Sequence, residues 1–499
     1  MLGNIVDGFY NFFHLSSFLY MNLGILLGII FGAIPGLTVL LCIVLFLPFT
    51  YGLDPIPSFM FLLGIYCAGS YGGSISAIMI KAPGTPHAAA TLLDGAPLAA
   101  KGFAKKALKT ALIASTIGGL VSAIALLFIS PFIAKVALHF GPPEYFILCL
   151  FGLSIVAGVS GTDLSKGIIS SCIGLFLATV GIDIMSGTFR FTFGNYNLFG
   201  GFDLVIIVTG LFAISETIMK AGFKKEAAKH KIDLAKMNKG EDVTFRDFKR
   251  MVRPISRSSL IGIIIGAIPG TGASMASFFS YDQARKRSKH PEEFGKGSIE
   301  GIAAAESANN AVTGATLIPL LTLGIPGDAV VAILVGAFMV NGLIPGPNLF
   351  VEHTVTIYAI MVGLIFTNVF MFLQGNFLAK FFAKVALIPT EILTPIIVLL
   401  CLTGAYSINN SFFDVLVSVI VGFVSYLLIR FDFSVIPVLL GLVLGPLAES
   451  NLRRSLLISH NDITIFFRRP ISAFFIAILL FSLVMVIVKN VKKKNSMRV

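Results

Sequence analysis

Two adjacent amide side chains, those of Asn309 and Asn310, lie inside a long apolar run, and Glu306 precedes them by about one helical turn. Side chains three and four positions apart share one face of a helix. Amides and carboxylates are costly in an apolar environment unless they are used there. An amide can donate to a carboxylate solute or accept from a cation-bound water, and it can equally make an interhelical hydrogen bond. We therefore predict that the two asparagines bind solute, with the interhelical bond as the alternative, and that Glu306 is a candidate site for a coupling ion.

Four breaks that pair proline with glycine interrupt the apolar runs. Proline lacks an N–H and ends a helix, and glycine lets the backbone leave helical geometry. The N–H groups after such a break suit carboxylates, and the carbonyl groups at opposing half-helix ends suit a cation such as Na⁺. The alternative is that each break only kinks a packed helix. The breaks are Pro35-Gly36, Pro83-Gly84-Thr85-Pro86, Pro269-Gly270 and Pro326-Gly327-Asp328.

Hydroxyl and carboxyl side chains gather around these breaks. Ser74 lies in the small-residue stretch 71–76, which suits close helix packing as well as binding. Asp94 and Asp328 are candidate cation or proton sites, or else lie at a membrane interface. The predicted substrate-binding residues are Ser74, Gly84, Thr85, Thr271, Asn309, Asn310 and Gly327; the breaks that line the site are Pro35, Gly36, Pro83, Pro86, Pro269, Gly270 and Pro326; and the coupling-ion candidates are Asp94, Glu306 and Asp328.

No catalytic motif accompanies these residues. The sequence has no H-E-x-x-H, and the stretch 72–76 lacks the second glycine of a nucleophile elbow. The five cysteines fall at unrelated spacings, which gives neither a disulfide framework nor a metal cluster. We expect no enzyme activity, no catalytic residues, no cofactor, and no metal beyond a coupling Na⁺; H⁺ is the other candidate coupling ion.

The composition places these residues in a membrane. Of 499 residues, 56% are hydrophobic and 12% are charged, whereas a soluble domain has about 25% charged residues. The net charge of +12 is concentrated in a few loops and the C-terminus, as membrane orientation requires, so nucleic acid is not an expected partner. We predict an all-α integral membrane protein with roughly 12–15 membrane segments, some of them broken or re-entrant.

One nine-residue stretch occurs twice. Gly28-Ile-Ile-Phe-Gly-Ala-Ile-Pro-Gly36 returns as Gly262-Ile-Ile-Ile-Gly-Ala-Ile-Pro-Gly270, with eight positions identical. A doubled helix break predicts an internally repeated transporter whose site lies between the repeats. We expect a first membrane repeat over 1–219, a basic cytoplasmic linker over 220–257, a second repeat over 258–450, and an extra span with a basic tail over 451–499.

The loop charges predict that the two repeats are inverted. The loop 50–57 has no Lys or Arg, whereas its counterpart 281–297 has five. The loop 101–109 is basic, and its counterpart 343–353 has no Lys or Arg. Since positive loops stay in the cytoplasm, corresponding loops lie on opposite sides of the membrane. The N-terminus is then outside and the C-terminus inside.

Several motifs, in order, resemble one family, the large membrane subunit (TctA-type permease) of tripartite tricarboxylate transporters. They include Tyr71-Gly-Gly-Ser-Ile, Ala82-Pro-Gly-Thr-Pro86, Phe294-Gly-Lys-Gly297, Ala308-Asn-Asn-Ala311 and Gly324-Ile-Pro-Gly327. The resemblance implies a bacterial secondary transporter in the cytoplasmic (inner) membrane. It further implies two partners, an extracytoplasmic solute-binding protein and a small membrane subunit of about four helices. The family imports citrate and other carboxylates.

Together, these features predict a binding-protein-dependent permease subunit that imports a small organic carboxylate, a tricarboxylate such as citrate or a related acid, by cation symport. The alternative is an autonomous anion carrier or channel without a binding protein.

Overall fold

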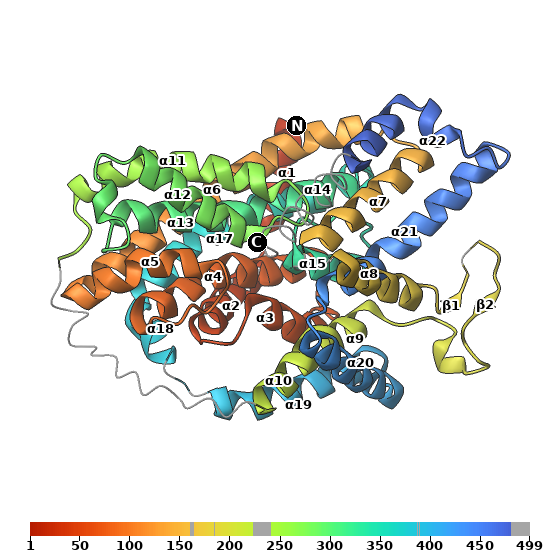
Figure 1. Ribbon diagram of the computed structural model, residues 1–499, viewed down its shortest axis with the longest axis horizontal. Coiled ribbons are helices and arrows are strands. Elements are labelled where there is room, and N and C mark those ends of the chain that lie inside the picture. Colours follow the sequence, from red (N-terminus) through yellow and green to blue (C-terminus); the bar gives the residue numbers. More distant parts are fainter. Residues whose placement is uncertain (160–163, 184, 223–240, 387, 389, 481–499) are drawn as a thin grey trace, which may run out of the picture. The chain divides into compact units, whose positions relative to one another are not determined.

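The computed structural model describes residues 1–159, 164–183, 185–222, 241–386, 388 and 390–480 (Figure 1). The chain forms two compact units, the first made of 1–134 and 219–408 and the second of 135–218 and 409–499. The segments of the two units alternate along the sequence. This division does not correspond to the expected repeats 1–219 and 258–450, which stay a prediction. Within the described ranges the only sheet pairs β1 (Gly181–Ile182) with β2 (Phe189–Arg190), antiparallel and with Gly181 opposite Arg190.

The described residues include six helices that are long and apolar enough to cross a membrane. Shorter apolar helices accompany them, such as Val39–Thr50 and Ala329–Val340. The prediction of an all-α membrane protein is confirmed, whereas the number of spans and the inversion of the repeats stay predictions. The six are Leu15–Ala33, Pro55–Ile80, Ala88–Ala137, Thr354–Phe377, Ile392–Asn409 and Phe412–Arg430.

The first copy of the repeated stretch packs helix α2 (Leu15–Ala33) against α4 (Pro55–Ile80) in the first unit. Gly24, Gly28 and Gly32, four residues apart, face α4, and a Cβ on Gly28 would lie 2.6 Å from the carbonyl oxygen of Ile65. Small residues at this spacing let two helix backbones approach closely. Helix α2 ends before Pro35-Gly36, and α3 (Val39–Phe46) starts beyond that break.

The second copy has the same role between α11 (Phe245–Gly266) and α13 (Ile299–Ala315). A Cβ on Gly262 would lie 2.5 Å from the carbonyl oxygen of Ala308, and Gly266 packs on Val312 and Ala315. After the break, α12 (Gly272–Arg287) packs on both helices. Figure 1 shows α11, α12 and α13 side by side. Each copy therefore consists of a glycine-lined helix contact followed by a helix break.

Helix α11 begins earlier than the second repeat was expected to begin. It starts at Phe245, so residues 245–257 of the expected linker 220–257 are helical. A capping box of Thr244 and Asp247 stabilises the start of the helix. The linker residues 223–240 lie outside the described residues.

The other two breaks interrupt the helices that follow. After α4, residues 82–87 form no helix, and a kink at Gly102, whose φ is 95°, separates α5 (Ala88–Leu98) from α6 (Ala104–Ala137). After α13, helix α14 (Leu317–Leu323) ends at Gly324, and α15 (Ala329–Val340) begins after Asp328. The remaining helices of the first unit are α1 (Leu2–Phe12), α16 (Leu349–Glu352), α17 (Thr354–Phe377), α18 (Ala379–Val385) and α19 (Thr390–Asn409).

The second unit has α21 (Ile436–Ile458) packed on α7 (Pro142–Val159) and α8 (Leu164–Ala178). Its other helices include α9 (Leu204–Val208), α10 (Ser215–Gly222, which carries the chain back to the first unit), α20 (Phe412–Arg430), α22 (Ile465–Arg468) and an apolar helix over Pro470–Leu480. This last helix covers the start of the expected last span 471–488, whose residues 481–488 lie outside the described residues.

Candidate functional site

The carboxylate of Glu306 in α13 is completely buried and is held by hydroxyl groups. Its Oε1 accepts hydrogen bonds from Ser74 in α4 and Thr91 in α5. Its Oε2 accepts from Ser115 in α6 at 2.7 Å. Within the described part of the chain, no Lys, Arg or His lies within ion-pair distance of this carboxylate. Three helices from the first half of the sequence thus converge on one acidic group from the second half.

Beyond Glu306, further polar side chains of α13 contact α4. The Asn309 amide donates to the carbonyl oxygen of Ser70 at 3.2 Å, and Cys67 Sγ contacts Thr313 Oγ1 at 3.6 Å. Residue numbers rise along α13 while they fall along α4, so the two helices run antiparallel here. We call this row of contacts the α4–α13 seam; its residues are Tyr66, Cys67, Ser70 and Ser74 on α4, Glu306, Asn309 and Thr313 on α13, and Thr316 at the end of α13.

The seam ends at the second-half breaks. Tyr66 lies 3.3 Å from Thr316 Oγ1 and donates to Asp328 Oδ2 at 2.5 Å. Asp328 in turn accepts from the backbone N–H of Val331 at 2.8 Å and so caps α15. The N–H of Gly270 donates to the carbonyl oxygen of Gly327 at 2.7 Å, which joins the two second-half breaks directly.

The first-half break at Pro83-Gly84 is packed against α2 and α4. The N–H of Gly84 donates to the carbonyl oxygen of Gly73 at 3.2 Å. A Cβ on Gly84 would collide with the carbonyl oxygen of Gly32, which belongs to the first motif copy. Thr85 is buried beside Gly73. Each motif copy therefore lies next to the other break of its own half.

Several predicted site residues have buried polar atoms without a hydrogen-bond partner. Among the described residues these atoms include Thr85 Oγ1, Asn309 Oδ1, and both Oδ1 and Nδ2 of Asn310. A buried polar group without a partner costs about 1–3 kcal/mol. Together with the Glu306 carboxylate, the oxygen atoms of this set are hard ligands, the type that alkali and alkaline-earth cations prefer, whereas Asn310 Nδ2 can only donate a hydrogen bond. Clusters of three or more His, Cys, Asp or Glu that could bind a metal are absent among the residues that could be searched.

Two predicted residues have evident structural roles. Asp94, completely buried in α5, accepts from the N–H groups of Gly297 and Ser298 at 2.8 and 2.9 Å, and so ties α5 to the start of α13. The hydroxyl of Thr271 donates to the carbonyl oxygens of Ile265, in the last turn of α11, and of Ile268, just beyond it, at 2.5 and 2.9 Å. Neither contact requires a ligand.

The prolines of the breaks differ in their exposure. Pro83 and Pro86 are exposed, as is Gly36, whereas Pro35, Pro269 and Gly270 are half-buried. Pro326 and Gly327 are buried, and a Cβ on Gly327 would lie 2.7 Å from Thr316 Cβ. Both proline and glycine are therefore buried in the Pro326-Gly327 break, whereas the prolines of the other breaks are more exposed.

Sequence reasoning missed part of the polar network. Four residues of this network were not among the predicted site residues: Tyr66, Ser70, Thr91 and Ser115. One signal was present: Tyr66, Ser70 and Ser74 recur every four residues in a largely apolar helix, which places them on one face. Nothing comparable marks Ser115, whose role depends on how α6 packs.

Comparison with known proteins shows matches over most of the chain. The sequence model of the Tripartite tricarboxylate transporter TctA family matches residues 18–440. An uncharacterized 52.8 kDa protein in the TAR-I ttuC' 3' region of Agrobacterium vitis is 37% identical over 498 residues, covering 99% of this chain and 98% of that protein. An uncharacterized protein in the TAR-II ttuC' 3' region of the same organism is 40% identical over 234 residues, covering 47% of this chain and 97% of that protein. No solved structure matches.

Proposed function

Because this chain belongs to the tripartite tricarboxylate transporter TctA family, we propose that it is the large permease subunit of a three-component secondary transporter. The transporter imports a small organic carboxylate, such as citrate, across the bacterial inner membrane. An extracytoplasmic binding protein delivers the solute, and a small membrane subunit completes the permease. The N-terminus is outside and the C-terminus inside.

The observation that carries the mechanism is the hydroxyl-lined carboxylate of Glu306. A buried charge inside a membrane protein is costly unless it is neutralised. Since its partners Ser74, Thr91 and Ser115 are all neutral, a transported cation would neutralise it. The residues fit either Na⁺, through carboxylate, hydroxyl and amide oxygens, or H⁺, through protonation of Glu306 itself. We therefore propose Glu306 as the coupling-ion site.

We further propose that buried polar side chains without a hydrogen-bond partner among the described residues bind the solute. The Asn310 amide can donate to a carboxylate, and Thr85 can donate its hydroxyl. In the present arrangement these side chains are buried, so the solute enters only when contacts along the seam separate. Motion of one half against the other around a central site is how repeat-built transporters alternate access. The equivalent packing of the two motif copies supports such a pair of repeats.

Reconstituted uptake tests this proposal. The chain and its small membrane subunit are placed in proteoliposomes, the binding protein is added outside, and uptake of labelled citrate and a panel of other carboxylates is measured. We expect uptake that requires both an imposed cation gradient and the binding protein. Failure to take up any acid of the panel would contradict carboxylate transport. Uptake that does not depend on the binding protein would instead indicate the autonomous carrier.

A further inference from the structure

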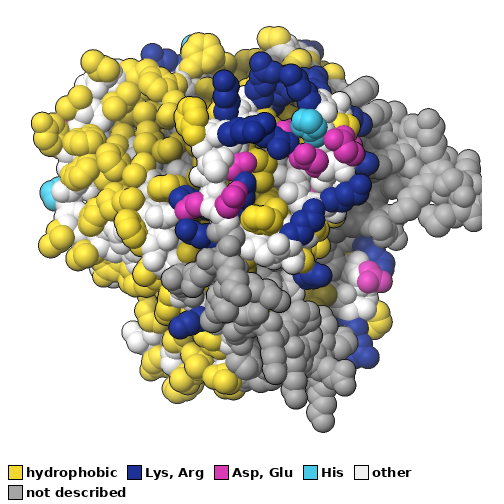
Figure 2. Space-filling model, turned by 90° about the vertical axis from the view of Figure 1, so that its left-hand side faces the viewer, with side chains coloured by type: hydrophobic (Ala, Val, Ile, Leu, Met, Phe, Trp, Pro, Cys, Tyr) yellow, Lys and Arg dark blue, Asp and Glu magenta, His cyan; other side chains and the backbone are white. Residues whose placement is uncertain are grey.

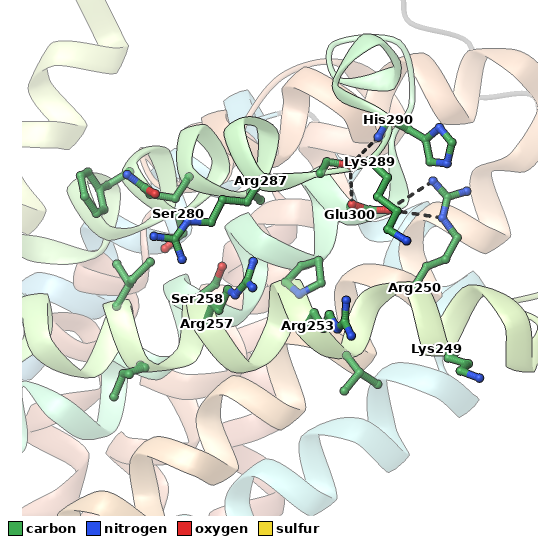
Figure 3. A pocket seen from close by; sticks show the side chains of 18 of the residues that line it. Lys249, Arg250, Arg253, Arg257, Ser258, Ser280, Arg287, Lys289, His290 and Glu300 are labelled. Carbon is green, nitrogen blue, oxygen red and sulfur yellow. Dashed lines mark hydrogen bonds and ion pairs between the residues drawn. The ribbon is translucent and has the colours of Figure 1, made fainter.

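A basic pocket lies between α11 and α12 and reaches Glu300 in the first turn of α13. Its volume is about 1030 Å³. One acidic residue, Glu300, lines it, against seven Lys and Arg. Figure 3 shows Arg253 and Arg257 of α11 facing Arg287 of α12 across this space. The seven cationic residues are Arg246, Lys249, Arg250, Arg253, Arg257, Arg287 and Lys289.

Among the described residues, most of this positive charge has no acidic partner. Glu300 pairs with Arg250 at 3.3 Å, and Arg250 also pairs with Glu293 at 2.8 Å. For the other six cations, no ion pair is found within the described ranges. Lys249, Arg253 and Arg257 moreover follow one another at four-residue spacing, where like charges destabilise a helix. A bound anion would relieve this repulsion.

The pocket lies at a border between basic and apolar surface. Beyond Arg257, helix α11 exposes Leu260 and Ile264, at 58% and 56%. On α12, Phe279 is 48% exposed before the basic end of the helix. Leu260 and Phe279 also line the pocket itself. Figure 2 shows Lys and Arg side chains gathered on one face of the molecule, with a broad apolar area beside them. A soluble anion would match only the basic part, whereas an amphiphile would match both.

We propose that this pocket binds an anionic phospholipid. Its phosphate lies among Arg253, Arg257 and Arg287, since the guanidinium fork suits phosphate oxygens. Its acyl chains run along Leu260, Ile264 and Phe279. Lys and Arg side chains near an anionic membrane surface are attracted to the lipid headgroups. The lipid would hold α11 and α12 at the membrane boundary, next to the second copy of the repeated motif.

Lipid binding to the full-length chain in detergent tests the proposal. Binding of phosphatidylglycerol is compared with that of phosphatidylcholine by native mass spectrometry. The variant R253Q/R257Q/R287Q should bind phosphatidylglycerol at least about tenfold more weakly. The control R285Q/K286Q/K384Q removes the same charge outside the pocket and should bind like the unaltered protein. Equal binding by both variants would overturn the proposal.

Two measurements on the unaltered protein complete the test. Phosphatidylglycerol, but not phosphatidylcholine, should slow amide hydrogen exchange in 246–260 and 275–290. This measurement does not depend on whether the triple variant folds. Inorganic phosphate should not displace the lipid at equal concentration. Displacement by phosphate, or equal protection by both lipids, would overturn a lipid site.

Discussion

At the scale of residues, α13 carries polar groups of two kinds. Glu306 has three hydroxyl partners, whereas the buried side chain of Asn310 has no hydrogen-bond partner among the described residues. Partnered groups add to the stability of the fold, but an unpartnered group subtracts from it. We therefore expect Asn310 to bind solute and not to stabilise the fold. Experiment can separate these two roles.

Replacement of Asn310 by alanine should impair transport without reducing stability. The variant N310A loses no hydrogen bond of its side chain, so its melting temperature should be unchanged or higher, whereas citrate uptake should fall by about fivefold or more. Both quantities are measured on the same reconstituted protein. The control N451A removes an amide that bonds the carbonyl oxygen of Leu447 in the second unit. Normal uptake by N310A would remove this residue from the site.

Part of the polar network could be predicted from the sequence. Asn309 and Glu306 were singled out as polar side chains in an apolar run and Ser74 as a hydroxyl near a helix break, and all three belong to the seam. Their roles in binding and coupling stay predictions. Thr91 and Ser115 were not, because a single hydroxyl in a helix commonly bonds its own backbone. Their contact with Glu306 depends on how α5 and α6 pack against α13.

At the scale of elements, the two motif copies act through glycines that have no room for a side chain. Gly28 lies against Ile65 of α4, and Gly262 lies against Ala308 of α13. The four-residue spacing of the glycines shows in the sequence which helix face permits close packing. The sequence does not show which helix packs on that face, because many apolar helices would fit it.

Alanine at either glycine should therefore destabilise the protein. A Cβ would lie 2.6 Å from a carbonyl oxygen at Gly28 and 2.5 Å at Gly262, which forces the helices apart. We expect G28A and G262A each to cost about 1–3 kcal/mol, measured as a lower melting temperature in detergent. The control G52A has no atom within 4 Å of the new Cβ and should melt normally. Unchanged melting of G28A and G262A would mean that these helix contacts are looser than described.

Ion pairs attach the start of α6 to Asp242, just before α11, and to Asp247 in the first turn of α11. Lys105 and Lys109 each lie 3.0 Å from Asp242, and Lys106 lies 2.6 Å from Asp247. Partial burial raises the pKa of Asp242, but hydrogen bonds from the two lysines outweigh it and hold the pKa at about 2. The carboxylate therefore stabilises the fold above its ordinary pKa of about 3.9, and this contribution is lost as the pH falls towards 2.

The difference in melting temperature between the unaltered protein and D242N should accordingly depend on pH. It should be present at pH 6, shrink below about pH 4 and vanish near pH 2. Because Asp242 is 39% exposed, screening by solvent keeps the effect below about 1 kcal/mol. D414N, at an exposed carboxylate paired with Asn409, serves as the control. A difference that grows on acidification would contradict the assignment of these ion pairs.

At the scale of the whole molecule, the first unit combines both motif copies, all four breaks and the seam. The all-α membrane class followed from composition, and the breaks followed from local proline–glycine chemistry. The start of α11 was missed because its many Lys and Arg suggested a loop, although they lie on an amphipathic helix with a buried face at Met251 and Ile255. The division into units depends on long-range packing and could not be read from the order of the segments.

The most direct test of the whole account is gradient-driven uptake by E306Q. Glutamine keeps the shape and can retain hydroxyl contacts, but it neither carries the negative charge nor takes up a proton. With Na⁺ and H⁺ gradients imposed separately, the unaltered protein should accumulate citrate under one of them. E306Q should lose at least about 90% of this accumulation, whereas E352Q, at an exposed carboxylate in α16, should retain it. Normal gradient-driven accumulation by a well-folded E306Q would contradict the proposal that this buried carboxylate couples cation and solute.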